Sequence, residues 1–249
     1  MSATPLQAVT FDFWNTLVAE TPGQLRGLRV DAWERILSRE GTPVARQDIE
    51  AAIDDSWRTF DAAWQANHQY RAPDAAGMVL AKLPVQVPPA VRDELVEVFV
   101  SVGSSAKLPA TTNVEVALAA LKEAGVRIGI ICDVGMTPST ILREHLEKHG
   151  LLGYFDHWSF SDEVGVYKPD PRIFDHALDG LGGIAPAASA HIGDLRRTDV
   201  AGAKALGITA VRYTGVWDDP AADGLPEGDL VVADHADLAT TLLAHHPTS

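Results

Sequence analysis

Short runs of β-branched and other apolar residues recur along the chain, and each run ends in a polar residue or a glycine. Runs of this length, bounded by turn-forming residues, are typical of strands with buried side chains. The pattern predicts five strands, which lie in the segments QAVTFDF, VRIGIICD, AHIGD, ITAVRYTG and DLVVAD.

Two segments between these runs have the apolar spacing of helices. Residues 113–125 read NVEVALAALKEAG and stop at Gly125, and residues 137–150 read TPSTILREHLEKHG and stop at Gly150. Pro138 stands where the first turn of a helix tolerates a proline. Because strands alternate with helices, the sequence predicts an α/β fold with a parallel sheet that is covered on both faces.

The segment from about residue 20 to residue 108 contains no comparable strand pattern. Its clearest signal is helical spacing at Ile49, Ile53, Trp57, Phe60 and Trp64. We interpret this stripe as a buried helix face rather than as a ligand-stacking surface. The chain is therefore predicted to fold as a Rossmann-like core of residues 1–18 and 109–249, with an inserted helical cap of residues 19–108 that closes over a site on the core.

Composition narrows the partners and the compartment. The chain has 249 residues, a formal net charge of −14 and no tract rich in Lys or Arg, which disfavours nucleic acid and anionic membrane surfaces as partners. The single cysteine, Cys132, fits a reducing compartment. Neither a signal sequence nor a membrane-spanning run is evident, so we expect a cytoplasmic protein. The sequence does not indicate the oligomeric state.

Aspartates follow three of the predicted strands: Asp12, Asp133 and Asp194. In an open α/β sheet the ligand crevice lies beyond the carboxyl ends of the strands, so these side chains are expected to converge. Asp12, Asp194 and Asp199 would repel one another unless a cation lay among them, and oxygen ligands favour Mg²⁺. Lys168, in GVYKPDP, would add a fixed positive charge. This combination suits phosphoryl transfer.

Four motifs together resemble those of the haloacid dehalogenase superfamily. They are DFWNT from Asp12 to Thr16, Cys132 after a strand, Lys168 in YKPDP, and GDLRRTD from Gly193 to Asp199. Their order and spacing match the superfamily, and the helical insertion after the first motif resembles its cap. The resemblance covers nearly the whole chain and implies a hydrolase, acting on a small phosphorylated metabolite through an aspartyl-phosphate intermediate.

The resemblance also implies roles for individual residues. Asp12 corresponds to the nucleophile and to a metal ligand, and Lys168 to the residue that orients the nucleophile and offsets charge on the phosphoryl group. Cys132 and Asp133 occupy the phosphate-binding motif. The implied Mg²⁺ ligands are Asp12, the backbone carbonyl of Trp14, Asp194 and Asp199. Asn15 and Thr16 are expected to shape the turn after the nucleophile, with Thr16 a candidate hydrogen-bond partner for the aspartate.

Two positions depart from the phosphatase pattern. Cys132 stands where a Ser or Thr is usual, and a thiol is a weak hydrogen-bond donor; a second interpretation makes Cys132 itself a nucleophile. Trp14 replaces the aspartate that serves as general acid, a role that indole cannot fill. Glu20 and His68 of the cap are candidate replacements, although a solvated position is the alternative for each.

Three functions remain open on this evidence. A metal-dependent phosphatase accounts for Asp194 and Asp199. A 2-haloacid dehalogenase accounts for an aromatic residue at position 14, but that reaction needs no metal, and the dehalogenases lack the acidic fourth motif. The third alternative is a catalytically weakened scaffold that binds a ligand or a partner, because fold alone does not fix function.

Overall fold

A computed structural model describes residues 4–247 and contains, within them, a six-stranded parallel sheet in the order β3-β2-β1-β4-β5-β6. The strands are β1 Ala8–Phe11, β2 Arg127–Cys132, β3 His157–Phe160, β4 Ser189–Gly193, β5 Thr209–Tyr213 and β6 Leu230–Val232. Every neighbouring pair is parallel. The predicted α/β class and parallel sheet are confirmed.

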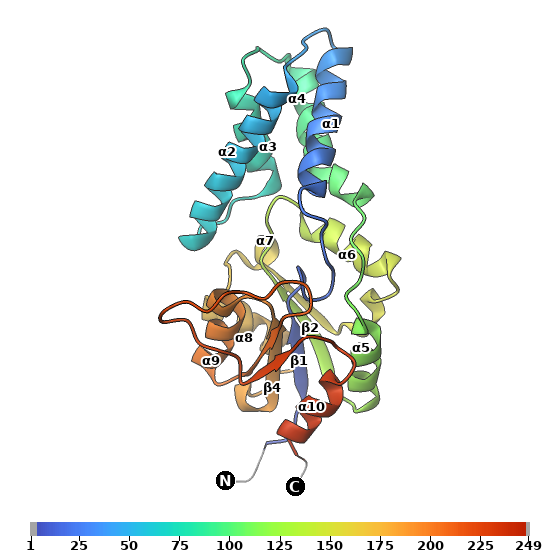
Figure 1. Cartoon of the computed structure of the whole chain (residues 1–249), viewed down its shortest axis with the longest axis vertical. Helices are drawn as coiled ribbons and strands as arrows, with labels where there is room; N and C mark the ends of the chain where they lie inside the picture. Colours follow the sequence, from blue (N-terminus) through green and yellow to red (C-terminus); the bar gives the residue numbers. More distant parts are fainter. Residues whose placement is uncertain (1–3, 248–249) are drawn as a thin grey trace. The chain divides into compact units, whose positions relative to one another are not determined.

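Helices cover both faces of this sheet. In Figure 1, α8 and α9 lie on one side of the strands and α5 and α10 on the other. The α-helices after residue 108 are α5 Val114–Glu123, α6 Ser139–Lys148, α7 Ser161–Val164, α8 Pro171–Gly180, α9 Ala201–Leu206 and α10 Leu238–His245. The two helices expected from apolar spacing correspond to α5 and α6.

The sheet contains one strand that the sequence pattern did not predict. β3 has only four residues, HWSF, and lies at the edge of the sheet, paired with β2 alone. Its first two side chains are only partly buried, so the segment lacks the continuous apolar run that marks the other strands. The five predicted strands correspond to β1, β2, β4, β5 and β6.

The register of the central strands brings three strand ends to one level. Phe11, the last residue of β1, pairs with Ile130 of β2 and with Ile192 of β4. The side chains of β1 are all buried, which fixes that strand at the centre of the sheet. The residues that follow each strand therefore leave the same edge of the sheet next to one another.

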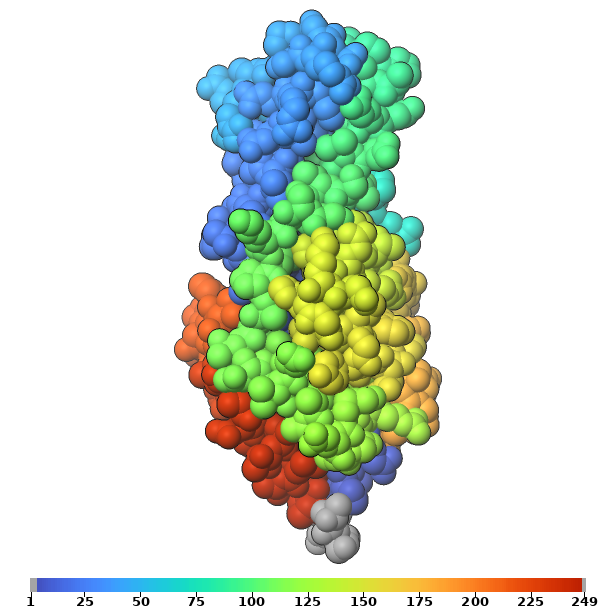
Figure 2. Space-filling model, turned by 90° about the vertical axis from the view of Figure 1, so that its right-hand side faces the viewer, coloured from blue at the N-terminus to red at the C-terminus, as the bar shows by residue number. Residues whose placement is uncertain are grey.

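The chain divides into two compact units. The core unit consists of the chain up to Ala19, Leu108–Asp133 and the chain from Leu146 onward, and the helical unit consists of Glu20–Lys107 and Val134–His145. The helical unit contains α1 Gln24–Arg39, α2 Arg46–Gln65, α3 Ala72–Lys82 and α4 Pro89–Ser101. Within it α1 and α4 lie side by side, as Figures 1 and 2 show.

The predicted apolar stripe of α2 is only partly buried. Ile49 and Ile53 are fully buried among the side chains of α1, α3 and α4, but Trp57 is 40% exposed. Phe60 and Trp64 are half-buried and stack with an interplanar angle of 10°. The expectation of a buried face is therefore confirmed for the first half of the helix and wrong for Trp57.

Arg29 of α1 is a buried cation that holds the second segment of the helical unit. Its guanidinium donates to the carbonyl of Met136 at 2.8 Å and to Thr137 Oγ1 at 3.1 Å, and it lies 4.8 Å from the ring centre of Phe99. Burial lowers the pKa of Arg29 to about 10, so the group stays charged at neutral pH. No helix in the described residues is long and apolar enough to cross a membrane.

We expect Phe99→Ala to destabilise the helical unit. Phe99 is fully buried, packs edge-on against Trp33 and supports the Arg29 guanidinium, so its removal leaves a cavity and should cost about 3–5 kcal/mol. Urea unfolding followed by circular dichroism measures the change. Val98→Ala, a change at a half-buried neighbour on the same helix, is the control. An equal loss of unfolding free energy in both variants would contradict the supporting role of Phe99.

Candidate active site

Four charged side chains gather, buried, beyond the carboxyl ends of β1, β2 and β4. Asp12, Lys168, Asp194 and Asp199 are each 5% exposed or less. Asp12 directly follows β1, and its backbone N–H continues the sheet by donating to the carbonyl of Ile192 at 2.8 Å. The convergence of these side chains at one edge follows from the strand register.

Lys168 is the centre of the cluster. Its ammonium donates to Asp12 Oδ1 at 2.5 Å, to Asp199 Oδ1 at 2.6 Å and to the carbonyl of Ile131 at 3.0 Å. An ammonium has three N–H groups, so all its donors are used. Burial acts to lower the pKa of Lys168, but the charges of Asp12 and Asp199 outweigh it and raise the pKa well above its usual value.

Two local features hold the Lys168 backbone. Its N–H donates to Asp133 Oδ1 at 2.8 Å. Two residues later, Asp170 caps α8 by accepting from Arg172 N, and Pro171 occupies the first turn of that helix. The structure therefore places the Asp133 carboxylate on the backbone of Lys168.

Both carboxylate oxygens of Asp199 are occupied by protein donors. Oδ1 accepts from Lys168 and from His191 Nε2 at 3.0 Å, and Oδ2 accepts from the Leu195 N–H at 3.0 Å and from Thr198 Oγ1 at 3.2 Å. Burial alone would raise the pKa of Asp199, but the Lys168 charge and the His191 hydrogen bond hold it well below its usual value. Asp199 is therefore an ionised carboxylate with no lone pair directed to open space.

The approach of Asp199 to β4 requires a glycine. A Cβ at Gly193 would lie 2.2 Å from Asp199 Cγ, a distance that atoms cannot adopt. Asp199 lies in Arg196–Val200, a short π-helical segment that carries it back over the end of the strand. Gly193 in the GDLRRTD motif is thus needed for space.

Among the described residues Asp194 has a single side-chain partner, Asn15, whose Nδ2 donates to Oδ2 at 3.1 Å. Asn15 has φ = 55°, in the left-handed region that asparagine tolerates better than most residues. Burial raises the pKa of Asp194 to about 7, and the negative charge of Asp199 adds to the shift. Sequence reasoning gave Asn15 only a role in the turn; the conformational tolerance of asparagine was the signal, but it did not identify the partner.

The donor set fits a divalent cation. Burial, together with the charges of Asp199 and Asp194, raises the pKa of Asp12 well above its usual value despite the Lys168 ammonium. Three buried carboxylates thus face one ammonium. Among the described residues no three His, Cys, Asp or Glu side chains form a metal-holding group. The Trp14 carbonyl accepts no backbone hydrogen bond within residues 4–247.

Cys132, the last residue of β2, is fully buried. Its thiol lies 3.5 Å from the carbonyl of Asp133 and donates to it. Burial and the neighbouring charge of Asp12 raise the pKa of Cys132 well above its usual value. Because the thiolate is the nucleophilic form, the alternative in which Cys132 attacks a substrate is not supported.

Trp14 stands at the position of the expected general acid, and the structure shows the contacts of this residue and of the two cap candidates. Trp14 is half-buried and packs edge-on against Phe13, with ring centres 5.1 Å apart. Of the cap candidates, Glu20 accepts from the Leu25 N–H at 3.0 Å at the start of α1, and His68 is exposed. Thr16 Oγ1 is buried without a partner among the described residues, so the expected bond to the aspartate is absent.

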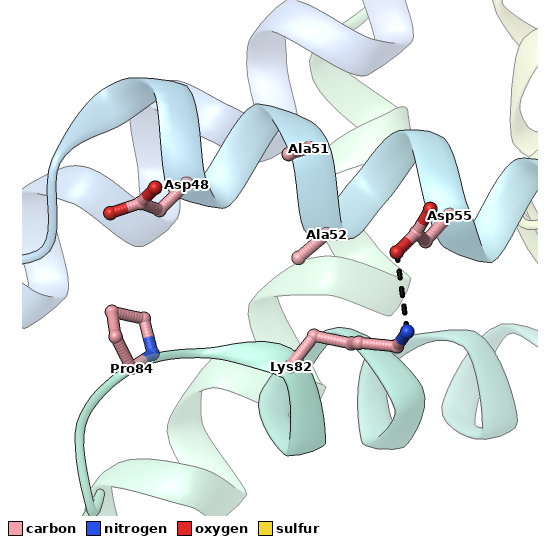
Figure 3. Close-up of a pocket in the computed structure, with 6 residues that line it drawn as sticks. All are labelled: Asp48, Ala51, Ala52, Asp55, Lys82 and Pro84. Carbon is pink, nitrogen blue, oxygen red and sulfur yellow. Dashed lines mark ion pairs between the residues drawn. The ribbon is translucent and has the colours of Figure 1, made fainter.

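A separate surface pocket of about 210 Å³ lies in the helical unit (Figure 3). Its edge is bridged by an ion pair between Lys82 and Asp55 at 3.3 Å. The lining residues are Asp48, Ala51, Ala52, Asp55, Lys82 and Pro84. The pocket contains none of the residues that the motifs single out.

The pKa of Asp194 predicts the pH dependence of stability in the absence of divalent metal. A carboxylate whose pKa rises from 3.8 to about 7 on folding contributes stability that is fully present below pH 3.8 and lost as the pH rises through 7. The loss is at most about 4 kcal/mol. Thermal unfolding in EDTA should show that the stability of the wild type falls as the pH rises from 5 to 8.5. The fall should be smaller in Asp194→Asn. Equal slopes in the two proteins would contradict the assignment.

Comparisons with known proteins identify the family of this chain. A family model described as haloacid dehalogenase-like hydrolase matches residues 6–207. A bovine haloacid dehalogenase-like hydrolase domain-containing protein 3 is 35% identical over 115 residues, which cover 45% of this chain and 44% of that protein. The phosphoserine phosphatase of Thermus thermophilus is 42% identical over 91 residues, 35% of this chain and 36% of that enzyme. The chain thus matches less than half the length of each relative.

Solved structures match over nearly the whole chain. A HAD phosphatase from Thermococcus onnurineus has a TM-score of 0.69 at 21% identity, covering 97% of this chain and 100% of that one. A 2-haloacid dehalogenase from Pseudomonas syringae has a TM-score of 0.68 at 22% identity, covering 96% and 98%. At these identities the likeness concerns the fold. With the family match across residues 6–207, the chain belongs to the haloacid dehalogenase-like hydrolases.

Proposed function

We propose that this protein is a Mg²⁺-dependent phosphatase that acts on a small phosphorylated metabolite through an aspartyl-phosphate at Asp12. The observation that carries the proposal is the charge of the buried cluster. The cluster holds three carboxylates, Asp12, Asp194 and Asp199, and one ammonium, Lys168, which pairs with Asp12 and Asp199. With all three carboxylates ionised, two negative charges are left for a divalent cation to balance.

Mg²⁺ would be held by the carboxylates of Asp12 and Asp194 and by the Trp14 carbonyl, and when bound it supplies positive charge next to the phosphoryl oxygens. Asp199 has no such role in this proposal, because both its oxygens are occupied by Lys168, His191, Leu195 and Thr198. Asp199 instead orients Lys168. The set of metal ligands that we propose therefore has three members, whereas the sequence predicted four.

In the proposed reaction, Lys168 holds Asp12 Oδ1, and Oδ2 makes no hydrogen bond among the described residues and is available for attack. Oδ2 forms a bond to phosphorus while the bond from phosphorus to the substrate oxygen breaks, and the electron pair leaves with that oxygen. Lys168 offsets the charge on the phosphoryl group. Water then attacks the phosphorus while the bond from phosphorus to Asp12 Oδ2 breaks, and the electron pair of that bond restores the Asp12 carboxylate. The protons of the water leave with the phosphate or pass to solvent.

Trp14 restricts this chemistry. General acid catalysis contributes about 10²–10⁴ in rate, and indole cannot donate the proton that a poor leaving group needs. We therefore propose that the preferred substrates have good leaving groups, such as aryl or acyl phosphates, or carry their own acid close to the scissile bond. Cys132 weakens phosphate binding relative to a hydroxyl, since its thiol is the poorer donor.

Sequence relatives support phosphoryl chemistry, because the Thermus thermophilus relative is named for a phosphatase activity. Dehalogenation is the competing proposal, favoured by the aromatic residue at position 14. The buried Asp194 argues against it: a carboxylate whose pKa is raised to about 7 serves no purpose in a metal-free displacement by Asp12. The two reactions differ in the need for a cation.

A substrate screen separates these reactions. Wild type should release phosphate from p-nitrophenyl phosphate or acetyl phosphate only with Mg²⁺, and Asp12→Asn should lower the rate by more than about 10³-fold. The same screen includes phosphoserine and 2-chloropropionate. Halide release without metal would overturn the phosphatase proposal, and an identical lack of turnover in both proteins would favour a binding scaffold.

Restoring the acid tests the role of Trp14. Trp14→Asp should raise turnover of alkyl phosphates relative to p-nitrophenyl phosphate by up to about 10²–10⁴-fold, because only the poorer leaving group needs protonation. Trp14→Asn introduces a side chain of the same size as Asp that is not an acid, and it should not raise this relative turnover. If both variants lose activity equally on both substrates, Trp14 has a positive function of its own.

A further inference from the structure

His191 is a buried side chain that the proposed reaction does not use. It lies on β4, three residues before Asp194, and is 1% exposed. Its Nε2 is 3.0 Å from Asp199 Oδ1, and its Nδ1 is 2.9 Å from Thr10 Oγ1 on the neighbouring strand β1. The ring therefore joins the two central strands to the carboxylate that holds Lys168.

The partners determine which ring nitrogen carries the proton. Asp199 is ionised and can only accept, so Nε2–H donates to it. Nδ1 then accepts from the Thr10 hydroxyl, which can donate. Burial lowers the pKa of His191, and the Phe174 ring packs against it in a T-shaped pair with ring centres 5.2 Å apart. His191 is thus a neutral imidazole with both nitrogens engaged.

The hydrogen bond from His191 restricts the rotation of the Asp199 carboxylate. Oδ1 is shared by two donors, His191 and Lys168, while the donors to Oδ2 come from the Leu195–Thr198 turn of its own segment. His191 is the donor that ties Oδ1 to the sheet. Without it, Oδ1 would be fixed only by the flexible lysine that it is meant to position.

We propose that His191 is a positioning residue for the hydrolytic reaction: through Asp199 it fixes the ammonium of Lys168 against Asp12. The hydrogen-bonded series runs from Thr10 through His191, Asp199 and Lys168 to Asp12. His191 touches neither substrate nor metal in this proposal. The kinetic part of the inference rests on the proposed phosphatase function, whereas the placement of the ammonium does not.

Two conservative variants separate positioning from simple packing. The amide nitrogen of Gln reaches the location of Nε2 and can donate to Asp199, whereas the shorter Asn reaches only the location of Nδ1. His191→Asn should lower kcat about 10- to 100-fold with KM nearly unchanged, as the loss of supporting hydrogen bonds does elsewhere. His191→Gln should stay close to wild type. Equal kcat values for the two variants would overturn the proposal.

A double variant tests whether His191 acts through Asp199. If it does, His191→Asn should cost nothing further in an Asp199→Asn background, because the bond it supports is already lost. Independent effects that multiply would overturn the proposal. Thermal unfolding of every variant accompanies the kinetics, so that loss of stability is measured separately from loss of kcat.

The placement of the Lys168 ammonium can also be measured without catalysis, even if the protein hydrolyses none of the phosphates offered. In ¹⁵N-labelled protein the Lys168 ammonium, buried and bonded to three acceptors, should give a slowly exchanging ¹H–¹⁵N signal, assigned by its absence in Lys168→Met. The signal should persist in His191→Gln and be lost in His191→Asn. Persistence in both, or loss in both, would overturn the inference, whatever the outcome of the substrate screen.

Discussion

The structure of the core depends on one buried cation. Removing an ammonium from water costs several kcal/mol, and Lys168 recovers this cost only because three acceptors surround it. Those acceptors come from three strands: Asp12 follows β1, Ile131 belongs to β2, and Asp199 lies on the turn after β4. One side chain therefore joins the ends of three neighbouring strands at a common edge of the sheet.

Short-range interactions set the position of each member. Asp133 holds the backbone of Lys168, Asn15 holds Asp194, and Gly193 leaves room for Asp199. Each of these features fixes the position of one charged group in the buried cluster. The excess of negative charge that remains is the property from which the metal-dependent reaction is proposed.

The sequence predicted much of this arrangement, and its failures have physical causes. β3 was missed because a four-residue edge strand needs no continuous apolar run. Trp57 was assigned to a buried face because helical spacing reports which side chains share a face and not whether a neighbour covers all of it. The hydrogen bonds that Asp199 accepts from Lys168 and His191 were not predicted, because these donors are distant from the turn in sequence or on a different element. The sequence did not indicate that segment 134–145 belongs to the helical unit, where Met136 packs into the core and its carbonyl accepts from Arg29.

The sequence alone determined the α/β class, the helical insertion and the convergence of the motif residues, since strand periodicity and the parallel arrangement place all strand ends at one edge. It also determined that Trp14 cannot act as an acid, because that follows from the chemistry of indole. Only the tertiary structure decided the partners within the site: that Lys168 bridges Asp12 and Asp199, that Asn15 supports Asp194, and that His191 supports Asp199. These pairings depend on side chains from separate strands meeting within 3 Å or so, and no local pattern in the sequence records such distances.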